Sequence, residues 1–257
     1  MEEDFKEFYD ERYKKGLRKS LSGYEFARWH ALYHFFKNIV KLDRPERILD
    51  YGCGSGLFYP LMRSLYPDSQ IYGADISSVA LDVLTDSFPE FSGKTNLIKN
   101  DKTDYQDNFF DLIISIEVME HVEYLDKYLT EINRILKKDG VFIWTTPCAN
   151  RFSIEHIYSS LTDQIGISSL GFRRWKWEDE AHVRRLTSQE AEAEMERLGF
   201  NDFKFRFRAH FFSFVCTRMS ARVKSLSRLF DKMMNLDYIL FRKFPNGASM
   251  IGAAKKK

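Results

Sequence analysis

The sequence lacks the features that direct a chain out of the cell or into a bilayer. Its three cysteines, Cys53, Cys148 and Cys216, are odd in number and far apart, which argues against a disulfide scaffold and for a reducing compartment. No apolar run approaches the ~20 residues that a membrane-spanning helix needs. The acidic start of the chain has no apolar signal region. We therefore expect a cytoplasmic protein, with peripheral contact to a membrane left open.

An excess of one charge is also missing. The 39 lysines and arginines nearly balance the 37 aspartates and glutamates, and the net charge is +2. This balance offers no whole-protein attraction for nucleic acid, so a case for RNA binding must rest on a local patch. The 257 residues show no internal repeat and are 44% hydrophobic, which is enough for one α/β domain with a cap. We expect a single domain over residues 1–257.

What the chain does contain is a short apolar run that ends in an acid and continues into alternate glycines, Ile48–Gly56. This pattern indicates a buried strand that enters a tight turn with room for a ligand. Dinucleotide sites require Gly-x-Gly-x-x-Gly, and Leu57 stands here in place of the third glycine. Asp50 would also repel a pyrophosphate, whereas it would hold a ligand that carries an ammonium group.

Strands and helices alternate along residues 45–147. The predicted strands cover 47–51, 70–74, 97–100, 111–116 and 141–145, and the helices between them cover 57–66, 79–88 and 124–136. This alternation predicts right-handed parallel crossovers and a doubly wound α/β sheet, in which ligands sit beyond the carboxyl ends of the strands. One acid lies at that edge for each of the first four strands, namely Asp50, Asp75, Asp101 and Glu117.

Further segments flank this core on both sides. Aromatic helices are predicted at 5–15 and 24–40, around a break at 16–23, so that residues 1–44 pack on the sheet or cover the site as a lid. An insertion over 148–186, rich in tryptophan and arginine, precedes a helix at 187–198 and strands at 202–208 and 249–254. Within 187–257 lies a basic amphipathic stretch over 218–240, whose stripe is clearest at 218–234. This helix either covers a hydrophobic surface or lies on an anionic membrane.

The ordered motifs resemble those of class I S-adenosylmethionine-dependent methyltransferases. Residues 50–56 are similar to the first motif of that family, 110–115 to its fourth-strand motif, and 136–142 to its turn into strand five, with Asp139 where Pro or Gly is usual. The resemblance implies a Rossmann-like seven-stranded sheet with its last strand antiparallel, N-terminal helices and a helical insertion.

The resemblance also implies how the cofactor is bound. S-adenosyl-L-methionine would lie against the glycine turn, with Asp75 on the ribose hydroxyls, Asp101 near the adenine amino group and Ile76 on the adenine face. Arg28 would reach a carboxylate from the lid, and Cys53 is expected to be small and unreactive. The product would be S-adenosyl-L-homocysteine. The implied cofactor-binding residues are Arg28, Asp50, Gly52, Cys53, Gly54, Gly56, Asp75, Ile76, Asp101, Lys102 and Ile116.

Catalysis requires the alignment of an acceptor, and a hydroxyl acceptor also requires a base. His121 follows the fourth strand beside the expected methyl position, and histidine suits that role near neutral pH. If residues 117–122 are helical, Glu117 and His121 share a face and Glu117 orients the base. The alternative is that His121 is bonded to the backbone at a helix entry.

A metal site is the second option for the same stretch. Glu117, Glu120, His121 and His182 form an oxygen and nitrogen set suited to a divalent metal. The Glu-x-x-Glu-His pattern resembles ubiquinone-pathway O-methyltransferases and small-RNA 2′-O-methyltransferases, and residues 178–187 resemble a later acid-histidine segment of such proteins. Because Glu-His is also widespread among family members without a metal, we expect no metal and keep this set as an alternative.

These observations favour an O-methyltransferase for a small-molecule, quinone-like, glycan or lipid-linked acceptor, acting as a monomer or a homodimer. RNA 2′-O-methylation is the first alternative, with Arg173, Arg174, Trp175 and Trp177 available for stacking and phosphate contacts. The second is a non-catalytic, cofactor-binding partner protein. The choice of acceptor is expected to depend on residues 148–185 and 211–245.

Overall fold

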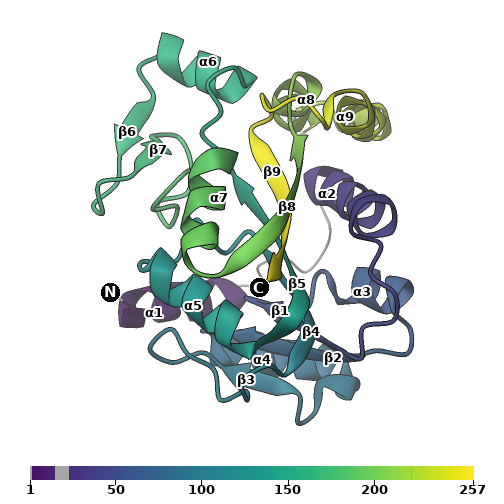
Figure 1. Cartoon of the computed structure of the whole chain (residues 1–257). Helices are drawn as coiled ribbons and strands as arrows, with labels where there is room; N and C mark the ends of the chain where they lie inside the picture. The colour runs from purple at the N-terminus through teal and green to yellow at the C-terminus, as the bar shows by residue number, and fades with distance from the viewer. Residues whose placement is uncertain (1, 15–22, 221) are drawn as a thin grey trace.

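The computed structural model describes residues 2–14, 23–220 and 222–257, and its central element is a seven-stranded sheet (Figure 1). The strand order is β3-β2-β1-β4-β5-β9-β8; β1 to β5 are parallel, and β9 runs antiparallel between β5 and β8. This confirms the predicted Rossmann-like fold with an antiparallel last strand. The bounds are β1 Arg47–Tyr51, β2 Gln70–Asp75, β3 Thr95–Leu97, β4 Phe110–Ile116, β5 Leu136–Pro147, β8 Phe200–Arg208 and β9 Ser249–Lys256.

Helices cover both faces of the sheet because its strands point alternate side chains to opposite sides. Ile48 and Ile114 face a core formed with α2, α3 and α4, whereas Leu49 and Ile113 face a second core formed with α5 and α7. Ser77 caps α4, and Thr187 begins α7 with a capping box. The bounds are α2 Gly23–Phe35 with a π-helical continuation Phe36–Val40, α3 Tyr59–Leu65, α4 Ser78–Ser87, α5 Leu125–Ile135 and α7 Ser188–Arg197.

Two predicted strand boundaries are wrong. β3 ends at Leu97 rather than at residue 100, and the chain then turns through left-handed backbone at Asp101, where φ is 60°. β5 begins at Leu136, directly after α5, because Leu136 already pairs with Phe110 of β4. The predicted turn into strand five at 136–142 therefore lies inside a long strand with an irregular register, rather than between a helix and a strand.

The aromatic N-terminal helix is present as α1, Glu2–Lys14, and residues 15–22 of the predicted break lie outside the described residues. Two polar contacts hold α1 across the carboxyl edge of the sheet. The Ser77 hydroxyl donates to Asp10, and Arg12 forms an ion pair of 2.7 Å with Asp179. The helix thus connects the start of α4 with the insertion that follows β5, a position that suits the lid interpretation.

The insertion folds as a helix, α6 Ile154–Leu161, and a small antiparallel hairpin, β6 Ile165–Ile167 and β7 Arg173–Trp175. Its two tryptophans help to build this unit. Trp175 is fully buried, and the Trp177 indole N–H donates to Ser159 Oγ at 2.9 Å.

The single amphipathic helix predicted at 218–234 is wrong. The chain forms α8 Phe212–Ser220, a 3₁₀ turn Lys224–Leu226 and α9 Ser227–Phe241, and the two α-helices lie side by side (Figure 1). Phe230 is buried while Leu226 is 43% exposed, so the predicted stripe does not form one face. Among the residues described, no helix combines the length and apolar character of a membrane span.

Candidate active site

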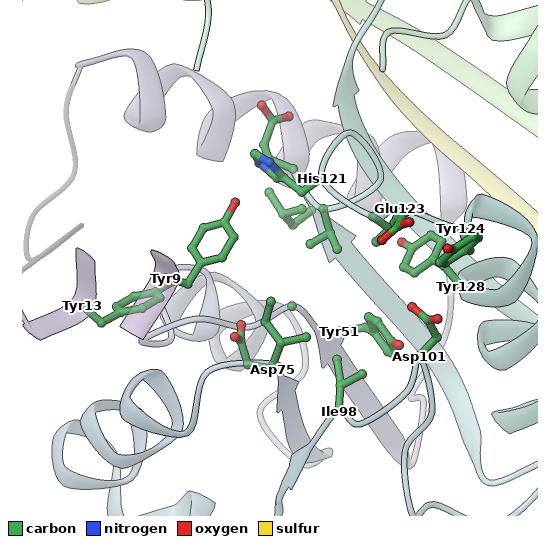
Figure 2. Close-up of a pocket in the computed structure, with 16 residues that line it drawn as sticks. Tyr9, Tyr13, Tyr51, Asp75, Ile98, Asp101, His121, Glu123, Tyr124 and Tyr128 are labelled. Atoms are coloured by element: carbon green, nitrogen blue, oxygen red, sulfur yellow. The ribbon is translucent and has the colours of Figure 1, made fainter. Parts of the chain in front are cut away.

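A pocket of about 1070 Å³, including its open mouth, lies beyond the carboxyl ends of β1, β2 and β4. Figure 2 shows Asp75 and His121 on opposite sides of the pocket, with Tyr9 of α1 between them, Tyr13 of α1 at one end and Asp101 at the other. A smaller pocket of about 300 Å³ shares Tyr13 with it and follows the glycine turn. Ten of the predicted residues line one pocket or the other: Asp50, Gly52, Cys53, Gly54, Asp75, Ile76, Asp101, Ile116, Glu117 and His121.

Asp75 ties the glycine turn to the start of α4. Its Oδ2 accepts the Gly54 N–H at 2.8 Å, and its Oδ1 accepts the Ser77 N–H at 2.9 Å. These bonds fix the direction of the carboxylate, and a carboxylate oxygen can accept more than one hydrogen bond. The arrangement suits the two vicinal hydroxyls of a ribose.

The turn itself has room only for glycine. Gly52 has φ of +78°, and a Cβ there would lie 2.3 Å from the Cγ2 methyl of Val118. Gly54 has φ of +53°, and a Cβ there would lie 2.2 Å from the Tyr13 hydroxyl. The bare backbone therefore forms a cradle between β1 and α1, as the methionyl part of S-adenosylmethionine requires.

Burial governs the ionisation of the turn. Asp50 is 3% exposed, and burial together with the charge of Asp75 raises its pKa to about 8. A cofactor ammonium beside Asp50 would favour the charged carboxylate again. Burial raises the pKa of the Cys53 thiol well above its usual value, which supports the prediction that Cys53 is unreactive.

The loop that carries Asp101 is held by α5. The Thr103 N–H and hydroxyl both donate to Glu131 Oε1, at 2.8 and 2.6 Å, and Arg134 donates to the carbonyl oxygens of Tyr105 and Thr103. Glu131 is 3% exposed. This buried network places Asp101 in the pocket although β3 ends four residues earlier.

Three predicted cofactor residues lie outside both pockets. Lys102 is exposed, and Gly56 faces Leu84 of α4, whose Cδ1 would lie 2.4 Å from an added Cβ. Arg28 is buried and forms an ion pair of 2.9 Å with Glu117. The contact of Arg28 with the pocket therefore passes through the Glu117 carboxylate.

The predicted orientation of His121 by Glu117 is wrong. Residues 117–122 form turns rather than a helix, Glu117 has φ of 56°, and its carboxylate is bonded to Arg28 and to the Thr145 hydroxyl. His121 Nδ1 instead lies 3.0 Å from the carbonyl oxygen of Ala181. Because a carbonyl only accepts, Nδ1 carries the proton and the Nε2 of the neutral ring carries the lone pair.

Three of the four predicted metal ligands come together. One ligand atom from each of Glu120, His121 and His182 lies within 4.8 Å of the others. Glu120 Oε1 is buried without a hydrogen-bond partner and lies 3.9 Å from His121 Nε2. His182 Nδ1 bonds Glu178 at 3.2 Å, so its Nε2 remains to act as a ligand. Glu117 is not in this cluster because its carboxylate is held by Arg28.

Sequence reasoning missed much of the aromatic wall. Tyr51, Tyr124 and Tyr128 line the pocket beside Asp101. Tyr51 lies inside the first motif, where an aromatic next to the glycines was a usable signal. Tyr128 belongs to the apolar stripe of α5, which a helical pattern alone assigns to the core.

The fold and this pocket define a class I S-adenosylmethionine-dependent methyltransferase domain. The profile of a methyltransferase domain family matches residues 21–204, more than half of the chain, and the chain belongs to that family. This finding confirms the cofactor, S-adenosyl-L-methionine, that the glycine turn predicted.

Relatives and solved structures agree with this assignment. A malonyl-[acyl-carrier protein] O-methyltransferase from Legionella pneumophila is 33% identical over 104 residues, or 40% of this chain and 36% of that protein. A ubiquinone biosynthesis O-methyltransferase from Pelagibacter ubique is 30% identical over 125 residues, or 43% and 49%. The matches thus span less than half of either relative. A Haemonchus contortus phosphoethanolamine N-methyltransferase 2 in complex with S-adenosyl-L-methionine, 17% identical, shares the fold with a TM-score of 0.59 over 98% of this chain and 60% of that one.

Proposed function

We propose that the protein methylates a hydroxyl group on an apolar, quinone-like acceptor. The observation that carries this proposal is the position of His121. Its Nδ1 is fixed by Ala181 O, and the ring lines the same pocket as Asp75 and Asp101. A hydroxyl acceptor needs a base with a lone pair at a defined atom, whereas an acceptor that is already a neutral amine would not need one.

Each residue then has a separate task. S-adenosyl-L-methionine supplies an activated methyl group when bound, so the protein chiefly aligns the acceptor. His121 Nε2 takes the hydroxyl proton as the oxygen attacks. Val118 and Val122 line the pocket beside it and keep water from the reacting oxygen, while Tyr9 approaches the imidazole edge-on with ring centroids 5.8 Å apart.

The support of the relatives for an oxygen acceptor comes from their names alone. Both are named O-methyltransferases, one of ubiquinone biosynthesis and one of a malonyl group on acyl-carrier protein. The pocket favours the first kind of acceptor, because its wall includes Tyr51, Tyr124 and Tyr128, which suit a flat ring.

RNA methylation is less well supported. Trp175, which was expected to stack on bases, is fully buried, and Arg185 lies over its ring at 4.8 Å. Trp177 is 36% exposed but is bonded to Ser159. An RNA-binding surface would therefore depend on Arg173 and Arg174, with Phe172, which is 39% exposed, as the aromatic beside them.

A metal-assisted reaction is the second candidate, and the unpartnered oxygen of buried Glu120 favours it. With His121 and His182, this carboxylate could hold a divalent cation that lowers the pKa of the acceptor hydroxyl. The two candidates need the same atom, since His121 Nε2 cannot both bind a metal and accept a proton. A chelator therefore separates them: activity that survives EDTA supports the base, whereas activity lost to EDTA and restored by Mn²⁺ or Zn²⁺ supports the metal.

The central test is acceptor screening with methyl-labelled cofactor. We expect transfer to an isoprenoid-tailed catechol or hydroquinone in preference to a malonyl thioester or an RNA oligonucleotide. His121→Gln should lower kcat by roughly 10²- to 10⁴-fold and leave the cofactor Kd unchanged. His30→Gln is the matched control, because His30 is exposed on α2 away from the pocket. Full activity of His121→Gln, or transfer to RNA alone, would contradict the proposal. Cofactor binding without transfer to any acceptor would favour the partner-protein alternative.

A further inference from the structure

The outer side of α9 is apolar along its length. Leu229, Leu236 and Leu240 are 50%, 46% and 54% exposed, and their spacing of seven and four residues places them on one face of the helix. Ile239 and Phe244 flank this line and are 46% and 58% exposed. Monomeric proteins rarely leave such a continuous apolar row in water without a binding role.

The neighbouring helix extends the same surface. Phe211, directly before α8, and Val215 and Met219 within it recur every fourth residue and are 39%, 48% and 41% exposed. Figure 1 shows α8 and α9 side by side near the upper ends of β8 and β9, away from α1. We call the exposed residues of 211–244 the α8–α9 face.

The orientation of this face is fixed by the core behind it. Cys216, Phe230 and Met234 are buried against Ala27 of α2. Asp237 is also buried, and its carboxylate accepts backbone N–H groups of the chain that enters α8, including that of His210 at 2.8 Å. Because the inner sides of both helices are occupied, the leucine row cannot turn inward without breaking these contacts.

The charges around the face have one sign. Every exposed charged side chain that the structure describes between residues 211 and 244 is cationic: Arg222, Arg228, Lys232 and Lys243. Lys232 lies one turn before Leu236 on the same side of α9, and Lys243 follows shortly after the helix ends at Phe241. The nearest acids compensate them only in part, because Asp231 is half-buried and Asp237 is buried.

We propose that the α8–α9 face docks on the surface of an anionic lipid membrane. Amphipathic helices lie in a membrane interface with their leucines at the level of the acyl chains and their lysines at the level of the headgroups. A second copy of the chain fits less well, since a two-fold contact through this face would bring its four cations against the same four cations. The proposal does not depend on the acceptor, because docking requires no methyl transfer.

The test is co-flotation of the whole protein with phosphatidylcholine vesicles that contain or lack phosphatidylglycerol. We expect binding only to the anionic vesicles and a loss of binding as salt is added. Lys232→Glu with Lys243→Glu should weaken the partition by roughly tenfold or more, since each cation near the surface contributes about fivefold. Leu236→Ser with Leu240→Ser should weaken it by a similar factor.

Matched variants separate this surface from general effects. Lys99→Glu with Lys138→Glu makes the same change in net charge at exposed sites far from α9, and Val83→Ser removes an exposed apolar side chain of α4. Both should float as the unmodified protein does. The proposal would be overturned if the protein did not float with anionic vesicles, or if the control variants lost binding equally. It would also be overturned by a dimer in light scattering that the leucine variants dissociate, or by capture on polyglutamate instead of vesicles. Methyl transfer to a water-soluble catechol, measured on the same variants, reports on the proposed function and not on membrane docking.

Discussion

The Gly54 N–H donates to Asp75 Oδ2 over 2.8 Å, so the acid expected to hold the ribose also holds the glycine turn. Asp75→Ala should therefore lose both functions. Because a hydrogen bond to a charged group contributes about 1.5–3 kcal/mol, loss of two ribose contacts should weaken cofactor binding by at least ~100-fold. Calorimetric titration with S-adenosylmethionine measures the change. Asp82→Ala, at an exposed position of α4, should bind normally; an unchanged affinity for Asp75→Ala would remove the ribose role.

Asp50 predicts a pH dependence with a definite sign. Its pKa in the folded protein is raised to about 8, so the ligand-free protein loses stability as the pH rises from about 4 to about 8 and the buried carboxyl ionises. The cofactor ammonium needs that charge, so affinity should rise with pH between 6 and 7.5, by up to about tenfold per unit.

Asp50→Asn should uncouple these effects. The amide cannot ionise, so the ligand-free variant should be more stable at pH 8, by roughly 2–5 kcal/mol, and should bind the cofactor weakly at every pH. Thermal unfolding with and without cofactor, together with titrations at pH 6, 7 and 7.5, tests both statements. A cofactor Kd that is independent of pH in the unmodified protein would count against the ammonium contact.

Gly52→Ala should be far more harmful than Gly93→Ala. Both glycines have positive φ, +78° and +71°, so each variant strains the backbone by about 1–2 kcal/mol. Only Gly52 faces a neighbour, since a Cβ there would meet Val118 at 2.3 Å, whereas a Cβ at Gly93 would have nothing within 4 Å. Urea unfolding should show a loss of stability from backbone strain in both variants and a larger loss in Gly52→Ala, and only Gly52→Ala should lose cofactor binding. Equal binding by the two variants would argue against the cradle.

The Arg28–Glu117 ion pair should be measurable by a double-mutant cycle. Both side chains are buried, so Arg28→Met leaves a carboxylate without its nearest cation and should cost about 3 kcal/mol in unfolding free energy. Arg28→Met with Glu117→Gln should recover most of that loss. Arg197→Met breaks the exposed pair with Glu194 and should change nothing measurable. If the double variant is no more stable than Arg28→Met, the two residues do not act as a pair.

The glycine-turn side of the pocket was predictable because its signals are local. Asp50 and the glycines lie in one turn, and Asp75 lies at the end of one apolar strand, where the strand pattern alone defines the edge of the sheet. The acceptor half depends on distant contacts. Ala181 O fixes His121 across 60 residues, and Arg28 reaches Glu117 across 89, and no periodicity records either contact.

The prediction of a single amphipathic helix at 218–234 was wrong for a related reason. Met219, Leu226 and Phe230 fit a helical repeat by spacing, yet they belong to α8, to the 3₁₀ turn and to α9. Spacing alone did not reveal the interruption between them. The packing of Phe230 against α2 determines which residues face the core, and this is a tertiary contact.

The position of β9 has a consequence for the order in which the protein is made. Among the strands that the structure describes, β8 pairs with β9 alone. β9 is synthesised about forty residues after β8, so β8 lacks this neighbour until residues 249–256 have emerged. All residues that line the cofactor pocket precede residue 129. A nascent chain can therefore assemble the part that holds S-adenosylmethionine while the edge that supports α8 and α9 is still unformed. S-adenosylmethionine could then bind and stabilise the partly synthesised chain before the protein is complete enough to transfer a methyl group.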